Sequence, residues 1–246
     1  MTLSNRARFS SKGLNILFVI PAREGSQRLI GKNYKKIKGK SLLKLKIDNC
    51  KKSCLGNIVV TSDCPIILDQ AKKYEVDFIR KRPKSLTGDG PSTPIVYDAV
   101  RFYERKSKSK ADIIILSQLT TPFVFDKDFK DSLNIFIKFI NKYKSLIACK
   151  EIDNNISWNI YEDIKGNSFK LSEKINSELK NFLVDKKIYI PNGGIYMFHR
   201  EHLNKKGSLY LAPTKIFKMT KLQSIDIDYE EDLKLAKIIG EEILSI

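Results

Sequence analysis

Short apolar runs alternate with amphipathic stretches along most of this chain. Residues 15–21 are apolar almost without interruption, which is typical of a strand buried on both faces of a parallel sheet. The same kind of pattern predicts further strands at 57–61, 77–80, 111–117, 146–150, 193–198 and 224–228, and helical spacing of apolar residues predicts helices at 41–54, 65–74, 93–106, 126–142 and 230–244. Strands that alternate with helices favour βαβ units. The expected fold class is therefore α/β, with a mostly parallel sheet and helices on both faces.

Two segments depart from this alternation. Residues 1–14 are polar, small and basic, and we interpret them as a flexible tail in front of one domain at 15–246. Residues 151–190 are rich in Asn, Glu and Lys with weak periodicity, so they are expected to form an insertion, a flap or an oligomer contact. No apolar run approaches the about 20 residues that span a bilayer, and no secretory signal is recognised. Four scattered cysteines favour a reduced, cytoplasmic protein.

The charge of the chain first suggests a nucleic-acid partner. There are 45 Lys and Arg residues against 28 Asp and Glu, which gives a formal net charge of +17 over 246 residues. Only nine of the basic residues are arginines, however, and the lysines are spread over every segment. Arginine is the residue that reads bases and grips phosphates with two bonds, so this composition indicates a solvated surface and an affinity for anions rather than a nucleic-acid site.

The loop after the first predicted strand, at 22–33, is the first candidate for chemistry. Open parallel sheets bind ligands at the carboxyl ends of their strands, and this loop leaves such an end. It combines glycines, which let backbone N–H groups approach an anion, with basic and amide side chains. The relevant residues are Arg23, Gly25, Ser26, Gln27, Arg28, Gly31, Lys32 and Asn33. The glycine spacing fits neither a Walker loop nor a dinucleotide fingerprint, so the alternative is an ordinary charged turn.

Asp226 and Asp228 form the second candidate, within the predicted strand at 224–228. Positions two apart in a strand share a face, so the two carboxylates would lie side by side while the isoleucines face the core. Paired carboxylates suit a hard divalent cation, Mg²⁺ above all, although a solvated acidic edge strand has the same pattern. Polar residues at other predicted strand and helix ends could reach the same rim: Arg82, Ser92, Gln118, Thr120, Thr121 and Tyr196.

Taken together, these motifs resemble the acylneuraminate cytidylyltransferases, also called CMP-sialic acid synthetases. The resemblance runs from about residue 16 to 239 in the right order and spacing. It rests on Pro-Ala-Arg-Glu-Gly-Ser-Gln-Arg-Leu-Ile-Gly-Lys-Asn at 21–33, Thr-Ser-Asp at 61–63, Arg82-Pro83, Gln-x-Thr-Thr-Pro at 118–122, Asn-Gly-Gly-Ile-Tyr at 192–196, Leu-Tyr-Leu-Ala-Pro-Thr-Lys at 209–215 and Ser-Ile-Asp-Ile-Asp at 224–228.

The resemblance implies a Rossmann-like, three-layer nucleotidyltransferase fold and a specific reaction. CTP and a nine-carbon 2-keto sugar acid would give a CMP-sugar and pyrophosphate with Mg²⁺, in a homodimer whose 151–190 insertion caps the neighbouring pocket. Arg23, Lys32 and Asn33 would hold the triphosphate, Arg82 and Ser92 the cytidine, and Gln118, Tyr196 and Tyr210 the sugar; Ala22, Gly25 and Ser26 complete the nucleotide-binding set. Asp226 and Asp228 would hold the metal and, with Arg23 and Lys32, carry the catalysis. Asp226 and a metal-bound hydroxide both stay open as acceptors of the sugar proton.

Several positions depart from the family pattern. Gln27 replaces a common Lys, Val124 a usual Arg, and a histidine–proline pair near Trp158 is absent. An arginine expected before the Asn-Gly strand is also missing, with Lys180, Lys186 or Lys187 as replacements that cannot form a fork on a carboxylate. Because these changes lie mostly around the sugar, a relative of sialic acid such as legionaminic or pseudaminic acid is a candidate substrate.

Three rival functions remain on the sequence alone. A sister nucleotidyltransferase acting on 3-deoxy-manno-octulosonate would share the fold, although the motifs at 118–122 and 224–228 are more similar to the sialate branch. A basic nucleic-acid-binding protein is the alternative that the charge suggests. A catalytically weak paralogue would keep the nucleotide loop for binding only.

Overall fold

The computed structural model describes residues 13–24, 29, 31–88, 90–152, 160–162, 168–170 and 187–244, and within them strands and helices alternate as expected. In chain order the elements are β1 (Ile16–Ala22), η2 (Lys32–Tyr34), β2 (Lys36–Ile37), β3 (Lys40–Ser41), α1 (Leu42–Ser53), β4 (Asn57–Ser62), α2 (Pro65–Lys73), β5 (Phe78–Lys81), η3 (Lys84–Leu86), α3 (Ser92–Ser107), β6 (Ile113–Leu116), α4 (Asp126–Lys138), β7 (Ser145–Glu151), β8 (Ile160–Glu162), β9 (Ser168–Lys170), β10 (Tyr189–His199), η5 (Arg200–His202), β11 (Thr214–Lys218) and α7 (Glu230–Ile243). None of the helices in this part of the chain is long and apolar enough to cross a membrane.

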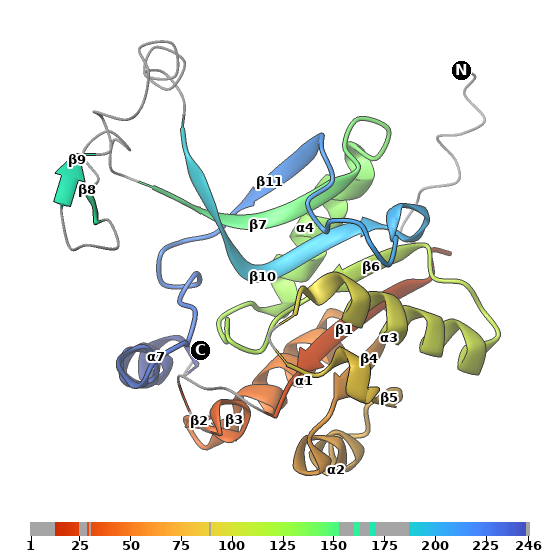
Figure 1. Ribbon diagram of the computed structural model, residues 1–246, viewed down its shortest axis with the longest axis horizontal. Helices are drawn as coiled ribbons and strands as arrows, with labels where there is room; N and C mark the ends of the chain where they lie inside the picture. The colour runs from red at the N-terminus through yellow and green to blue at the C-terminus, as the bar shows by residue number, and fades with distance from the viewer. Residues whose placement is uncertain are drawn as a thin grey trace.

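The described strands form one seven-stranded sheet in the order β11-β7-β10-β6-β1-β4-β5, which crosses the middle of Figure 1. β1 pairs in parallel with both β4 and β6, and β5 continues the parallel pairing beyond β4. β10 runs antiparallel between β6 and β7, while β11 is parallel to β7. Every strand of this sheet except β10 therefore points the same way, and the prediction of a mostly parallel sheet is confirmed.

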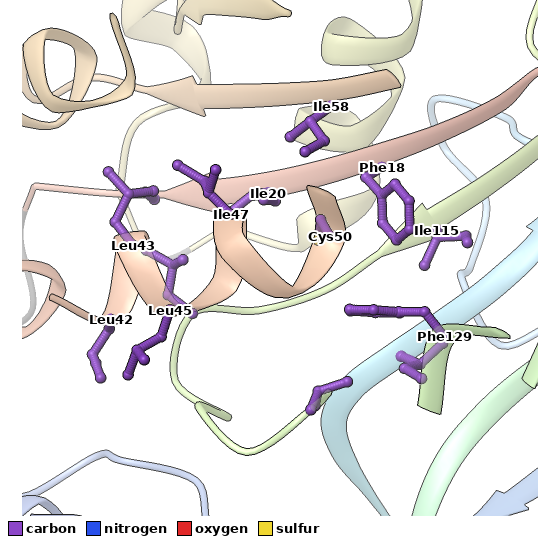
Figure 2. Packing of buried hydrophobic residues seen from close by; sticks show 14 of the residues in the cluster. Phe18, Ile20, Leu42, Leu43, Leu45, Ile47, Cys50, Ile58, Ile115 and Phe129 are labelled. Carbon is purple, nitrogen blue, oxygen red and sulfur yellow. The ribbon is translucent and has the colours of Figure 1, made fainter. Parts of the chain in front are cut away.

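Helices cover both faces of this sheet because successive residues of the central strand point in opposite directions. Phe18 and Ile20 of β1 face a core shared with α1, α2, α4 and α7, whereas Leu17 and Val19 face a second core built on α3. Figure 2 shows the first of these cores, with Phe18 between α1 and Phe129 of α4. The rings of Phe18 and Phe129 meet edge to face at 5.0 Å. The result is the predicted three-layer α/β architecture.

The Ser-Ile-Asp-Ile-Asp segment is not a strand, which corrects one prediction. Its isoleucines do alternate inward, and Ile227 is completely buried. Its backbone does not pair with a described strand of the sheet, however. It makes one backbone hydrogen bond to the loop at 118–122, from Ile227 N to Thr120 O at 2.8 Å, and one bond does not form a β-ladder. Two further differences concern β11, which the sequence pattern missed because Lys215 and Lys218 interrupt its apolar alternation, and α4, which ends at Lys138 instead of continuing to 142.

The predicted insertion begins where β7 ends and finishes within β10. Of this stretch the structure describes residues 151–152, 160–162, 168–170 and 187–190. β8 and β9 pair antiparallel, with Ile160 opposite Lys170. This small hairpin lies beyond the ends of β7 and β10, away from the helices of the main sheet (Figure 1). The predicted capping and dimer roles fall largely on residues 153–159, 163–167 and 171–186, outside the described part of the chain, as does the predicted tail at 1–12.

Gly56 is the point where the turn before β4 comes closest to β1. A Cβ atom at this position would lie 2.0 Å from the backbone oxygen of Ile16, and a backbone atom cannot swing aside as a side chain can. We expect Gly56→Ala to lower the free energy of unfolding by about 1–3 kcal/mol, measured by urea denaturation. Gly90→Ala is the matched control, because a Cβ there meets open space, and it should leave the unfolding midpoint nearly unchanged. Equal midpoints for the two variants would contradict the close approach.

Candidate active site

A pocket of about 390 Å³ opens at the carboxyl ends of β1, β5 and β6, where an open α/β sheet binds its ligands. Its walls come from four loops that are far apart in the sequence. The residues that line the pocket are Pro21, Arg23, Lys32, Asn33, Arg82, Gly88, Gly90, Ser92, Ile95, Gln118, Leu119, Thr120 and Asp228. Eight of the residues predicted for this rim are among them: Arg23, Lys32, Asn33, Arg82, Ser92, Gln118, Thr120 and Asp228. The structure thus brings together most of the predicted nucleotide-binding set and one member of the acidic pair.

The loop after β1 is held in place at both of its described ends. The Glu24 N–H donates to Asp63 Oδ1 at 2.9 Å, and Asn33 Nδ2 donates to Arg23 O at 2.6 Å. Gly31, at φ 67°, then turns the chain into the short helix η2, which carries Lys32 into the pocket. Gly25 and Ser26 belong to residues that the structure does not describe. Ala22 is buried beneath the pocket rather than lining it.

Lys32 and Asp228, 196 residues apart in the chain, meet inside this pocket. Lys32 Nζ lies 2.7 Å from Asp228 Oδ1, and the lysine side chain is 8% exposed against 40% for the aspartate. The Asp228 backbone is fixed in turn, because its N–H donates to Asp232 Oδ2 in the first turn of α7. The acidic segment therefore faces the basic loop across the pocket. The ion pair orients both groups, with the exposed side of the carboxylate toward the open space.

Asp226 lies beside this pair but does not line the pocket. Loss of water around its carboxyl raises the pKa of Asp226 above the ordinary value, and the negative charge of Asp228 adds to that rise. A hydrogen bond from the Thr120 side chain and the charge of Lys32 oppose the shift. The two carboxylates thus sense each other's charge, which is the arrangement that a cation would relieve.

Arg82 is the most deeply buried cation of the pocket wall. The residue is 5% exposed; Nη2 donates to Thr61 O at 3.0 Å, and Nε has no hydrogen-bond partner within the described residues. Burial lowers the pKa of the Arg82 guanidinium, the charge of Arg23 lowers it further, and Asp63 opposes both. A buried donor without a partner is costly, so this guanidinium is oriented for an acceptor that enters the pocket.

The predicted sugar residues divide into two groups. Gln118 lines the pocket, and Gly193 leaves room for it: a Cβ on Gly193 would lie 2.6 Å from Gln118 Oε1. Tyr196 and Tyr210 lie outside this lining and pack edge to face with their ring centroids 5.8 Å apart. Burial raises the pKa of Tyr196, and its hydrogen bond with Tyr210 and the carboxylate of Asp226 add to the rise. The tyrosine pair is therefore close enough to the acidic segment to sense the charge of Asp226.

The prediction gave no role to several residues of the site. Asp63 fixes the basic loop by accepting the Glu24 N–H. The sequence could have predicted this role, because Asp63 directly follows the predicted strand at 57–61, whose carboxyl end lies at this rim. Gly88, Gly90 and Ile95 complete the wall near Arg82, and the Gly-Pro-rich loop in front of α3 was the only hint of them.

Comparison with known proteins gives consistent results. The family model described as "Cytidylyltransferase" matches residues 17–243. The chain is 30% identical over 230 residues to a CMP-N,N'-diacetyllegionaminic acid synthase of Legionella pneumophila, covering 93% of this chain and 97% of the relative. It is 27% identical over 225 residues to a pseudaminic acid cytidylyltransferase of Campylobacter jejuni, covering 91% and 95%. A solved structure of CMP:2-keto-3-deoxy-manno-octonic acid synthetase complexed with CTP superimposes with a TM-score of 0.65 at 17% identity, covering 93% of this chain and 99% of that one.

Proposed function

The chain belongs to the cytidylyltransferase family, and from this premise we propose that it couples CTP to a nine-carbon 2-keto sugar acid, giving a CMP-sugar and pyrophosphate. The observation that carries the proposal is the meeting of Arg23, Lys32, Arg82 and Asp228 in one pocket at the strand ends. Two of these cations, Arg23 and Lys32, suit the triphosphate of a ligand in this pocket of about 390 Å³.

In this proposal the protein acts mainly by positioning its substrates and neutralising their charge. Arg23 and Lys32 bind the phosphates, and Asn33 supports them by holding the backbone of the basic loop. Arg82 and Ser92, on the opposite wall, bind the cytidine. The hydroxyl group of the sugar attacks the α-phosphorus in line with the departing pyrophosphate, whose growing charge Arg23 and Lys32 stabilise.

Magnesium is part of the proposal, and the residues present fit it. Asp226 and Asp228 supply oxygen ligands, which Mg²⁺ prefers; burial raises the pKa of Asp226, and the charge of Asp228 adds to that rise. No group of three or more His, Cys, Asp or Glu gathers within the described residues, so phosphate oxygens of the nucleotide would complete the coordination. When bound, the ion would add positive charge opposite the reacting phosphate.

The proposed sugar is a relative of sialic acid, with legionaminic and pseudaminic acids as the first candidates. The two relatives described above carry those sugars in their names. Val124, at the position where the sialate pattern has an arginine, is fully buried and packs against Gly194, so the carboxylate of the sugar meets no arginine there. Gln118, Tyr196 and Tyr210 are proposed to contact the sugar. A cytoplasmic homodimer completes the proposal, with the 151–190 insertion of one chain capping the other's pocket.

A pyrophosphate-release assay tests this function. Purified protein with CTP and Mg²⁺ is offered a panel of nine-carbon and eight-carbon 2-keto sugar acids. We expect release with at least one nine-carbon acid and none with ATP, GTP or UTP at the same concentration. Release with the eight-carbon acid alone would assign the chain to the octulosonate branch. No release with any sugar, or release with another nucleotide only, would overturn the proposal.

A further inference from the structure

Lys46 is a charged residue in the middle of the hydrophobic core. It lies on α1 among leucines and isoleucines, is completely buried, and does not line the pocket. Burial lowers the pKa of Lys46 to about 8, while the Cys50 thiol on the same helix and the Asp128 carboxyl on α4 act in the opposite direction. An ammonium group in such surroundings costs stability unless it is well paired.

The ammonium group of Lys46 is used to hold one loop. Nζ donates to the backbone oxygen of Thr121 at 2.9 Å and stands 6.0 Å from the ring centroid of Phe129. Figure 2 shows the surroundings of this contact: α1, with Cys50 on it, faces Phe129 across the core. Lys46 thus ties a helix of the core to the Gln-x-Thr-Thr-Pro segment at 118–122.

That segment builds one wall of the pocket and anchors the acidic segment. Gln118, Leu119 and Thr120 line the pocket. Thr120 O accepts the N–H of Ile227 at 2.8 Å, between the two aspartates, and the Thr120 side chain forms a hydrogen bond with Asp226. A continuous set of contacts therefore runs from Lys46 through segment 118–122 to the Asp226 carboxylate and to the backbone between the two aspartates.

We propose that Lys46 is a positioning residue, whose buried ammonium fixes segment 118–122 and thereby sets the placement of Gln118 and of the Asp226–Asp228 segment. The inference rests on the proposed function for its effect on the reaction. It goes beyond that function because Lys46 touches neither the pocket nor a substrate. A methionine at this position would fill the same space without a buried charge, so packing of the core alone does not require a lysine here.

Lys46→Met tests the inference through kinetics. We expect kcat for pyrophosphate release to fall about 10- to 100-fold, because small misplacements of reacting groups have effects of this size. The Kd for CTP without metal should stay within about 3-fold, since Arg23 and Arg82 come from other loops and lose no contact. Lys51→Met is the matched control: it removes a lysine-to-carbonyl bond from the exposed face of the same helix, Nζ to Tyr74 O at 2.8 Å, and should leave kcat unchanged.

A second measurement needs no substrate. Amide hydrogen exchange at Ile227 should be about 10-fold faster in Lys46→Met than in the wild type or in Lys51→Met, because the acceptor Thr120 O is no longer held. If the wild type released no pyrophosphate, the proposed function would fail, and this measurement would still decide whether Lys46 positions the acidic segment. Should Lys46→Met not fold, Lys46→Gln, which keeps an N–H donor without the charge, allows the same comparison.

The pH dependence of the free energy of unfolding tests whether the Lys46 ammonium is buried. The pKa of Lys46 is about 8 in the folded chain against 10.5 for an ordinary lysine, so between these values the unfolded chain binds more protons. The free energy of unfolding of the wild type should therefore rise relative to Lys46→Met as the pH increases from 8 to 10.5. Lys51→Met should follow the wild type. A Lys46→Met protein with wild-type kcat and wild-type exchange at Ile227 would overturn the inference.

Discussion

Pyrophosphate release should fall about 10²- to 10³-fold when Asp228 is replaced by asparagine. The Asp228 carboxylate lines the pocket and lies 2.7 Å from Lys32 Nζ, so it is the negative group that a divalent cation and the basic loop both face. Asparagine keeps the shape and removes the charge. The variant would therefore lose the negative charge that complements the cation, without losing a packed side chain. Initial rates with CTP and the preferred sugar acid, over a range of Mg²⁺ concentrations, measure the effect.

The Mg²⁺ dependence separates two explanations of such a loss. If Asp228 binds the metal, Asp228→Asn should need at least about 10-fold more Mg²⁺ for half-maximal rate. If it only orients Lys32, kcat should fall with an unchanged Mg²⁺ dependence, and the metal assignment would then be wrong. Glu230→Gln is the control, because it neutralises a carboxylate in a looser ion pair, 3.8 Å from Lys35 Nζ, two residues further along. Its rate should equal that of the wild type.

Asp228→Asn should lower the stability of the chain moderately without preventing it from folding. The contact that fixes this residue locally is made by its backbone N–H with Asp232 Oδ2, which the substitution leaves intact. The side chain is 40% exposed, so its surroundings can accommodate the amide. The asparagine oxygen can still accept from Lys32 Nζ, but this ammonium, 8% exposed, loses its paired charge, so the free energy of unfolding should fall by about 1–2 kcal/mol. A large loss of stability would make the kinetic result uninterpretable as a site effect.

The alternation of strands and helices was predictable because buried strands have a strong local signature. The run at 15–21 and the run of isoleucines in β6 are apolar on both faces, which only a covered sheet requires. The edge strand β11 could not be found in this way, since lysines at an edge reach water while the backbone still pairs. The Ser-Ile-Asp-Ile-Asp segment shows the opposite failure: its alternation is that of a strand, but one backbone bond to Thr120 does not make a ladder.

The site was partly predictable for a different reason. Arg23, Lys32 and Gln118 follow predicted strand ends or short loops, and parallel strands bring their carboxyl ends to one rim. The pairing of Lys32 with Asp228 could not be predicted from the pattern, because it joins residues 196 positions apart. Nor could the role of Lys46, which on a helical wheel is one lysine among several on a lysine-rich helix.

Arg82→Lys should weaken CTP binding about 100-fold, the second large effect that the structure predicts. Arg82 is 5% exposed, holds Thr61 O through Nη2, and keeps Nε free of any partner in the described chain. A lysine cannot make both contacts at once, because its single ammonium has no fork. The loss of a charge-assisted bond, together with the burial of a poorly paired ammonium, corresponds to about 3 kcal/mol. Titration calorimetry with CTP measures the effect, and Arg101→Lys, on the exposed face of α3, is the control.

The affinities of Arg82→Lys for cytidine, CMP and CTP show which part of the nucleotide Arg82 contacts. If Arg82 binds the cytosine ring, Arg82→Lys should weaken cytidine, CMP and CTP by the same factor. Arg23→Met should then weaken CTP while leaving cytidine unchanged, because its contact is with phosphate and falls with added salt. If Arg82 binds phosphate instead, the factor should grow from cytidine to CTP, and the cytidine assignment would be wrong. The burial of the guanidinium favours a contact with the cytosine ring. Removing water from a charged phosphate costs more free energy than removing it from the neutral edge of a base.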